Sequence, residues 1–135
     1  MKRLSVIICT ALILFGFSSC FTGPENYYVK YEAQISSVHY GSDAKYVVST
    51  ESGSKTITTR SKTWTETFGP VKKSFTASVS GEAHYDGTMT LNIYVCRGEE
   101  PFVLKASKTG DVSTWGTMEG VEKPMTASVS YTIDF

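Results

Sequence analysis

The chain has 135 residues, of which 19% are charged, and 13 Lys and Arg balance 13 Asp and Glu. With both signs interspersed, this balance argues against a nucleic-acid-binding protein, which needs a basic stripe. It argues equally against a domain that is captured by anionic lipid through charge alone.

Residues 1–19 carry the pattern of a secretion signal. Two basic residues precede the apolar run 4–17, and a pair of small residues comes directly before Cys20. The run is shorter than the roughly 20 apolar residues that a spanning helix needs, and the order basic, apolar, small is that of a cleaved signal. We therefore predict a signal peptide over 1–19.

The cysteine that follows the small pair adds a second prediction. Phe17-Ser18-Ser19-Cys20 resembles the lipobox of bacterial lipoproteins, in which the cysteine thiol receives a diacylglyceryl group before cleavage. We predict a lipid on Cys20, a short tether over 20–26 and a single domain over 27–135. The protein would then lie in the bacterial cell envelope, most simply on the outer membrane, on a face that the sequence leaves open. The alternative is an ordinary secretory signal that contains a cysteine.

Cleavage leaves 135 − 19 = 116 residues, with 13 − 2 = 11 basic against 13 acidic residues and a net charge near −2. That length suits one domain with a core of its own. Cys96 is then the only cysteine besides the lipidated one, so no intramolecular disulfide is expected. We predict a passive strand residue at this position, with a reactive thiol as the alternative.

The chain after the tether alternates between apolar and polar residues, and no sustained helical periodicity interrupts it. Alternation of this kind, broken by glycine-containing turns, predicts strands. The final segment is the most regular, and 88–96 looks like a central strand. Residues 112–123 are ambiguous. The expected strands are 27–35, 45–50, 55–60, 64–68, 71–80, 88–96, 102–108 and 125–135, with breaks at Gly69-Pro70, Gly81 and Gly110-Asp111.

Seven or eight short strands without helices predict an all-β fold, either an antiparallel sandwich or a barrel. At this length we favour a two-sheet β-sandwich of immunoglobulin-like type, without the inter-sheet disulfide and with Trp64 as the candidate core tryptophan. The run Thr-Ala-Ser-Val-Ser occurs at 76–80 and again at 126–130. Because the flanking residues differ, coincidence between two alternating strands is favoured over duplication of a half-domain.

Four segments together carry a resemblance to a known family: 29–32 (Val-Lys-Tyr-Glu), a glycine-bearing hairpin, 63–68 (Thr-Trp-Thr-Glu-Thr-Phe) and 91–95 (Leu-Asn-Ile-Tyr-Val). Over about residues 27–108 the chain resembles small β-sandwich proteins related to the mycobacterial MmpS transport accessory family, which have lipidated relatives among envelope proteins of the Bacteroides group. The chain departs from that pattern in having Cys96-Arg97-Gly98 after the Ile-Tyr-Val strand, followed by an extra C-terminal strand. The resemblance implies an immunoglobulin-like fold and a non-enzymatic accessory role, and it assigns no site residue.

The residues that catalysis needs are not arranged in any recognisable motif. His39 and His84 lie far apart in the sequence, and neither belongs to a metal-ligand spacing. No serine sits in a Gly-x-Ser-x-Gly elbow, and the adjacent carboxylates Glu99 and Glu100 would point in opposite directions. We therefore predict no enzyme, no cofactor and no metal.

Three classes of function remain open. An envelope accessory module that binds a protein partner agrees with the resemblance. A glycan-binding module is the alternative, with Tyr28, Tyr94 and Trp115 as candidate ligand contacts because aromatic faces stack on sugars. A third class, a subunit that assembles by strand exchange, is suggested by the long C-terminal strand.

Overall fold

The computed structural model describes residues 25–36, 43–83, 87–110 and 125–135. Within these ranges the chain forms eight strands and no helix, so no described helix is long and apolar enough to cross a membrane. The strands are β1 (Tyr27–Ile35), β2 (Ala44–Thr50), β3 (Gly53–Thr59), β4 (Thr63–Val71), β5 (Thr76–Ala83), β6 (Met89–Arg97), β7 (Val103–Gly110) and β8 (Met125–Thr132).

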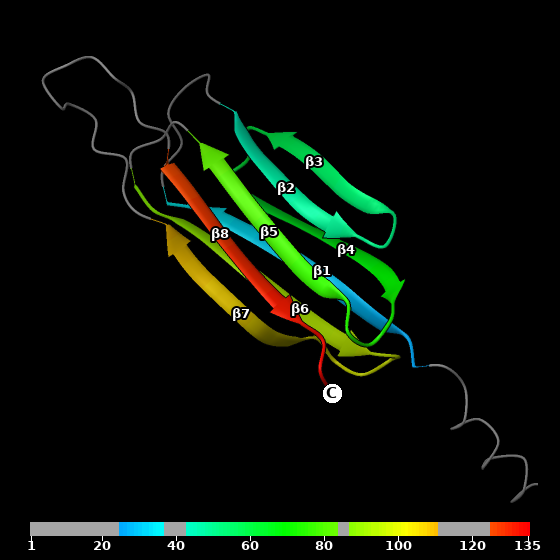
Figure 1. Ribbon diagram of the computed structural model, residues 1–135. Helices are drawn as coiled ribbons and strands as arrows, with labels where there is room; N and C mark the ends of the chain where they lie inside the picture. Colours follow the sequence, from blue (N-terminus) through cyan, green and yellow to red (C-terminus); the bar gives the residue numbers. More distant parts are fainter. Residues whose placement is uncertain (1–24, 37–42, 84–86, 111–124) are drawn as a thin grey trace, which may run out of the picture.

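The strands form two antiparallel four-stranded sheets that pack face to face (Figure 1). Sheet A has the order β4-β1-β6-β7, and sheet B has the order β3-β2-β5-β8. The edges β7 and β8 lie side by side on one flank of the sandwich, and β3 and β4 form the edges on the other. This arrangement confirms the all-β two-sheet sandwich that the alternating sequence predicts.

The core lies between the sheets and is built from the inward-facing residue of each alternating pair. In β1 and β6 every second side chain is buried, because successive residues of a strand point to opposite faces. Sheet B contributes Tyr46 of β2 and otherwise small or aliphatic residues from β2, β5 and β8 to the same layer. The largest fully buried side chains are Tyr27, Tyr31, Tyr46, Met89, Leu91, Ile93, Met125 and Ile133.

Glycine and proline do not end the strands where the sequence suggested. β4 continues through the cis peptide bond between Gly69 and Pro70, and β5 continues through Gly81. A Cβ atom at Gly81 would lie 2.5 Å from the Met89 sulfur and 3.0 Å from the Tyr46 ring. This glycine therefore makes room for core side chains and is not a turn residue. The predicted strand 71–80 is wrong in its first part, since β5 starts at Thr76 and Ser74 has a positive φ of 72°.

Trp64 lies at the margin of the core, since it comes from the edge strand β4 and is half-buried. Its ring stacks on that of Tyr46 across the two sheets, with centroids 5.4 Å apart. Beside it, Lys55 of β3 forms a 2.6 Å ion pair with Glu66 of β4. These contacts close the flank formed by β3 and β4.

On the other flank, a Cβ atom at Gly110 would lie 2.7 Å from the Thr126 carbonyl oxygen, so glycine permits β7 and β8 to approach closely.

A buried tyrosine links the two sheets through hydrogen bonds. The Tyr31 hydroxyl, from sheet A, donates to the Ser49 carbonyl oxygen of sheet B at 2.7 Å. The Ser49 hydroxyl donates to the carbonyl oxygen of Thr76 and accepts from the Ser78 amide, at 3.0 and 2.8 Å. It thereby continues the contact between β2 and β5 beyond their last register pair.

We expect the burial of the Tyr31 hydroxyl to make the free energy of unfolding fall at alkaline pH. Burial raises the pKa of Tyr31 above its ordinary value of 10.0. Well below pH 10 the phenol is neutral in both the folded and the unfolded state, so its stabilising contribution is fully present. Above that pH the unfolded chain releases the proton first, and the contribution is lost as the pH rises through the folded-state pKa, at up to about 1.4 kcal/mol per pH unit.

Urea unfolding of the protein and of Tyr31→Phe, compared between about pH 8 and about pH 11, measures this effect around the ordinary tyrosine pKa. Tyr31→Phe should be less stable at the lower pH and show a smaller loss at the higher one. Tyr27, Tyr94 and Tyr131 also have raised pKa values, so some alkaline loss should remain. Identical pH dependence in the two proteins would contradict the assignment to Tyr31.

Candidate functional site

Two of the candidate contact residues, Tyr28 and Tyr94, lie on the same outer face of sheet A. Tyr28 pairs with Cys96 and Lys30 pairs with Tyr94 in the register of β1 and β6. The two tyrosines are therefore diagonal cross-strand neighbours, close enough for aromatic side chains to share one surface. Both are half-buried. We call the five outward residues at the centre of this surface the tyrosine face: Tyr28, Lys30, Glu32, Asn92 and Tyr94.

Glu32 is the centre of a hydrogen-bond network on the tyrosine face. Its Oε1 atom accepts from Asn92 Nδ2 at 2.9 Å, from the Tyr94 hydroxyl at 3.3 Å and from Gln34 Nε2 at 3.4 Å. The Ser107 hydroxyl of β7 donates to Asn92 Oδ1 at 2.6 Å. Desolvation, followed by the Glu32 charge, raises the pKa of Tyr94. The network fixes polar side chains from β1, β6 and β7 in one orientation.

The aromatic rings of this face already have partners within the chain. Lys30 Nζ lies 4.4 Å from the Tyr94 ring centroid and 5.1 Å from that of Phe102. A Cβ atom at Gly69, whose φ is 141°, would lie 2.8 Å from Tyr28 Cδ1, so this ring packs directly on the β4 backbone. A sugar that stacks on Tyr94 would compete with Lys30. The tyrosine face therefore suits a partner with both polar and apolar groups better than a flat stacking ligand.

Several sequence-based candidates lie outside the described residues. These are Cys20 with the signal and most of the tether, His39, His84 and Trp115. The structure thus brings together two of the three candidate aromatics and does not describe the third. Sequence reasoning missed Glu32, Asn92 and Lys30 as members of this site. The alternation places Lys30 and Glu32 on the same face as Tyr28, but the neighbour of β1 depends on strand order, which alternation does not reveal.

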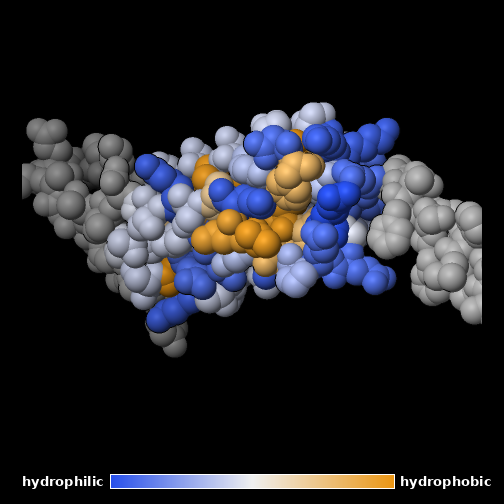
Figure 2. All heavy atoms as spheres, turned by 90° about the horizontal axis from the view of Figure 1, so that it is seen from below, coloured by the Kyte–Doolittle hydropathy of each residue, from blue (hydrophilic) through white to orange (hydrophobic). Residues whose placement is uncertain are grey.

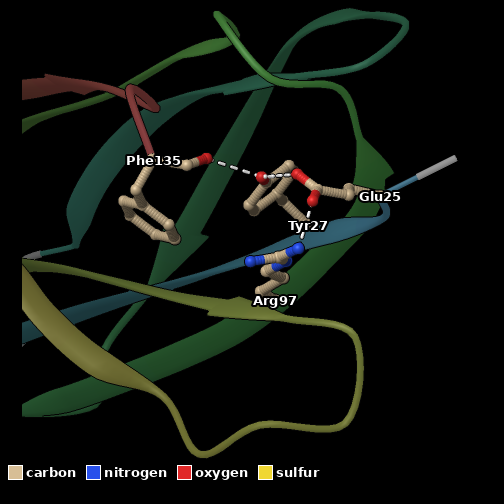
Figure 3. A network of polar contacts seen from close by, with 4 residues as sticks. All are labelled: Glu25, Tyr27, Arg97 and Phe135. Atoms are coloured by element: carbon tan, nitrogen blue, oxygen red, sulfur yellow. Dashed lines mark hydrogen bonds and ion pairs between the residues drawn. The ribbon is translucent and has the colours of Figure 1, made fainter. Parts of the chain in front are cut away.

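A polar cluster holds the start of β1 against the end of the chain (Figure 3). The Tyr27 hydroxyl lies 2.5 Å from Glu25 Oε2 and 2.6 Å from the main-chain oxygen of Phe135, and these two acceptors share its one proton. The Arg97 guanidinium forms an ion pair with the same Glu25 carboxylate. The hydrogen bond to Glu25, followed by burial, raises the pKa of Tyr27. The residues that enter β1 are therefore fixed to the end of β6 and to the C-terminal segment.

Cys96 matches the passive strand residue that we predicted. It lies on the outer side of β6 opposite Tyr28, yet it is only 5% exposed. Desolvation raises the pKa of its thiol, and the cationic side chain of the adjacent Arg97 pairs with Glu25. A protonated, buried thiol is a poor nucleophile.

An apolar patch lies on the flank formed by β7 and the C-terminal segment. Figure 2 shows it as a continuous orange area bordered by hydrophilic residues. Val103, Leu104 and Phe135 are the large apolar side chains that are exposed among the described residues, at 53%, 50% and 37%. Lys105 Nζ lies 4.0 Å from the Phe135 ring centroid. We call these three apolar residues the β7 patch.

The outer face of sheet B differs from both of these surfaces because hydroxyl side chains dominate it. Two shallow hollows of about 440 and about 430 Å³ lie on it. The first is lined by Lys45, Glu82 and Lys108 together with hydroxyls, and it can form hydrogen bonds with a polar ligand. Within the described ranges no three His, Cys, Asp or Glu side chains are grouped to hold a metal ion. The outward hydroxyl residues are Ser54, Thr56, Thr58, Thr76, Ser78, Ser80, Thr126, Ser128, Ser130 and Thr132.

Comparison of the chain with protein-family models, with curated proteins and with solved structures finds no match. The resemblance to the MmpS-related proteins therefore stays a prediction, and the arguments for function come from the surfaces described above.

Proposed function

We propose that the protein is a lipid-anchored accessory module of the bacterial cell envelope that binds a protein partner through the tyrosine face and catalyses no reaction of its own. The observation that carries this proposal is the placement of Tyr28 and Tyr94 on one face of sheet A, around the polar network of Glu32.

The composition of the tyrosine face supports a protein partner. Tyrosine is enriched where protein interfaces derive most of their binding energy, because its ring buries apolar area while its hydroxyl forms hydrogen bonds. The contacts of Asn92 with Glu32 and Ser107 hold the polar groups in place before binding, which lowers the entropy lost on association. Lys30 adds a charge above the Tyr94 ring.

Strand exchange through β8 has less support than side-chain binding. β8 pairs with β5 of its own sheet over eight residues, from Thr76↔Thr132 to Ala83↔Met125. A partner that replaced β8 would have to displace this whole register. A glycan would have to stack on the same two tyrosines. Lys30 already lies over the Tyr94 ring, and the backbone at Gly69 already packs on the Tyr28 ring.

Site-specific photo-crosslinking in the native cell tests the proposal. A benzophenone amino acid at position 94 should give an adduct of one discrete larger mass, whereas the same group at Thr56, exposed on the outer face of sheet B, should give none. Combining the position-94 probe with Glu32→Ala should reduce the adduct severalfold, because that change removes the acceptor of the network. Equal adducts at both positions would reject a partner at this face. Loss of glycan-array binding in Tyr94→Ala without any protein adduct would favour the glycan alternative.

A further inference from the structure

We infer that the β7 patch rests on the bilayer that carries the lipid anchor, so that the sandwich lies with its β7 flank on the membrane and its tyrosine face free. This inference rests on the lipidation of Cys20 in the proposed function. It adds a second, non-covalent membrane contact made by the folded domain itself.

The first argument is the short reach of the tether. Only five residue steps separate Cys20 from Glu25, which limits their separation to roughly 18 Å even when the chain is fully extended. Glu25 is fixed to the domain through Arg97 and Tyr27, and the Gly98 amide donates to the Asn26 carbonyl oxygen at 2.7 Å. The end of the sandwich where β1 begins is therefore held close to the bilayer.

The second argument is that the β7 patch lies at that same end. Val103 pairs with Val95, which pairs with Val29, only two residues beyond the start of β1. At the rise of a strand this is about 7 Å along the sandwich. The Phe135 main-chain oxygen accepts from Tyr27, so the third member of the patch belongs to the same end. Figure 1 shows the start of β1, the turn between β6 and β7 and the C-terminus together there.

The third argument is the chemistry around the patch. Lys105 of β7 lies against the rings of Phe135 and Tyr131. Aromatic side chains and lysines with apolar stems are the residues that occupy the boundary between headgroups and acyl chains. Glu99 and Glu100 lie in the preceding turn, so apolar contact, not net positive charge, would drive the association.

A protein is a less suitable occupant of this flank. β7 is an edge strand, but its register shifts beside Lys105, and both Lys105 and Lys108 lie along it. A bulge and lysines on an edge strand oppose the addition of another strand. Three large apolar side chains are also few compared with the roughly 800 Å² that each partner buries in a stable interface. A bilayer held near by the lipid needs no such area, because the anchor raises its effective concentration.

The test uses the full-length lipidated protein in vesicles of phosphatidylethanolamine and phosphatidylglycerol. An environment-sensitive fluorophore is attached at Val103→Cys and, as a matched control, at Thr56→Cys on β3, the sheet edge remote from β7. Both positions are exposed, whereas Cys96 is buried and should remain unlabelled. Quenching by nitroxide-labelled lipid reports bilayer contact, and quenching by aqueous iodide reports exposure to water.

The inference expects the label at 103 to be quenched severalfold more by nitroxide lipid than the label at 56, and to be protected from iodide. Flotation of the vesicles separates the two proposals. If the protein floats with the vesicles but both labels respond alike, the bilayer contact is wrong and the anchor stands. If the label at 103 is protected from iodide without lipid quenching, a second copy of the chain covers the patch and the inference is again wrong. Failure to float would overturn the anchor and the inference together.

Discussion

Ile93→Asp is expected to abolish folding of the domain. Ile93 is fully buried in β6, which pairs with β1 on one side and with β7 on the other. Its side chain points into the layer between the sheets, where water cannot solvate a carboxylate. Burying an unpaired charge costs several kcal/mol, which is comparable with the total stability of about 5–15 kcal/mol of a typical domain. Far-UV circular dichroism and urea unfolding measure the outcome.

Two matched variants separate the new charge from other effects. Thr90→Asp places the same side chain on the same strand but on the outer face, next to Gln34 and Thr109, and should change the stability by less than about 1 kcal/mol. Ile93→Val keeps the apolar character and should cost about 0.5–1.5 kcal/mol. A folded Ile93→Asp with the stability of Thr90→Asp would show that β6 is not the centre of the core.

The alternation of the chain was enough to predict this core because burial in a sandwich is decided by one face of each strand. The inward residues Met89, Leu91, Ile93 and Val95 are all fully or almost fully buried. The same pattern in β1 places Val29, Tyr31 and Ala33 in the core. What alternation could not provide is the order of strands in each sheet, since a strand with one apolar face can pair with any neighbour.

Strand ends were less predictable where a glycine makes room for a side chain from another strand. The sequence predicts a strand end at Gly81. This glycine nevertheless lies within β5, because Met89 and Tyr46 fill the space that a side chain would take. Gly69 lies within β4 because the ring of Tyr28 packs on it. In both places the reason for glycine is a residue distant in sequence. Local turn rules therefore predicted strand ends at these two glycines, whereas tertiary contacts allow the strands to continue through them.

The candidate site, like the core, was predictable as far as the alternation determines which face of a strand each residue occupies. Tyr28 and Tyr94 alternate with the buried apolar residues of their strands, so the pattern alone places both on the outer face of sheet A. Glu32 and Asn92 follow the same alternation, but their contact depends on the pairing of β1 with β6. The β7 patch could not be predicted from the sequence, because strand order decides that β7 is an edge strand. At an edge, no neighbouring strand covers an apolar side chain.

Cys20→Ala is expected to remove the lipid and to release the protein from the membrane fraction. Each acyl CH₂ group that enters the bilayer contributes about 0.8 kcal/mol, so two or more chains hold a protein stably, whereas a single chain holds it only marginally. The β7 patch offers three exposed apolar side chains in place of those acyl chains, so by itself it should give at most weak, reversible binding. Metabolic labelling with an alkyne fatty acid and fractionation of the cells measure the two effects separately.

Cys96→Ala is the matched control, because it removes the other cysteine downstream of the signal, from a buried strand position. It should keep both the fatty-acid label and the membrane location of the parent protein. In Cys20→Ala the label should vanish, and the fraction of protein that pellets with membranes should fall at least tenfold once the signal has been removed. A native protein whose mass shows an unmodified Cys20 thiol would refute the lipobox, because the lipid is attached through that sulfur. Removal of 1–19 would then be ordinary secretion, and the β7 patch would lose the anchor that brings it to the bilayer.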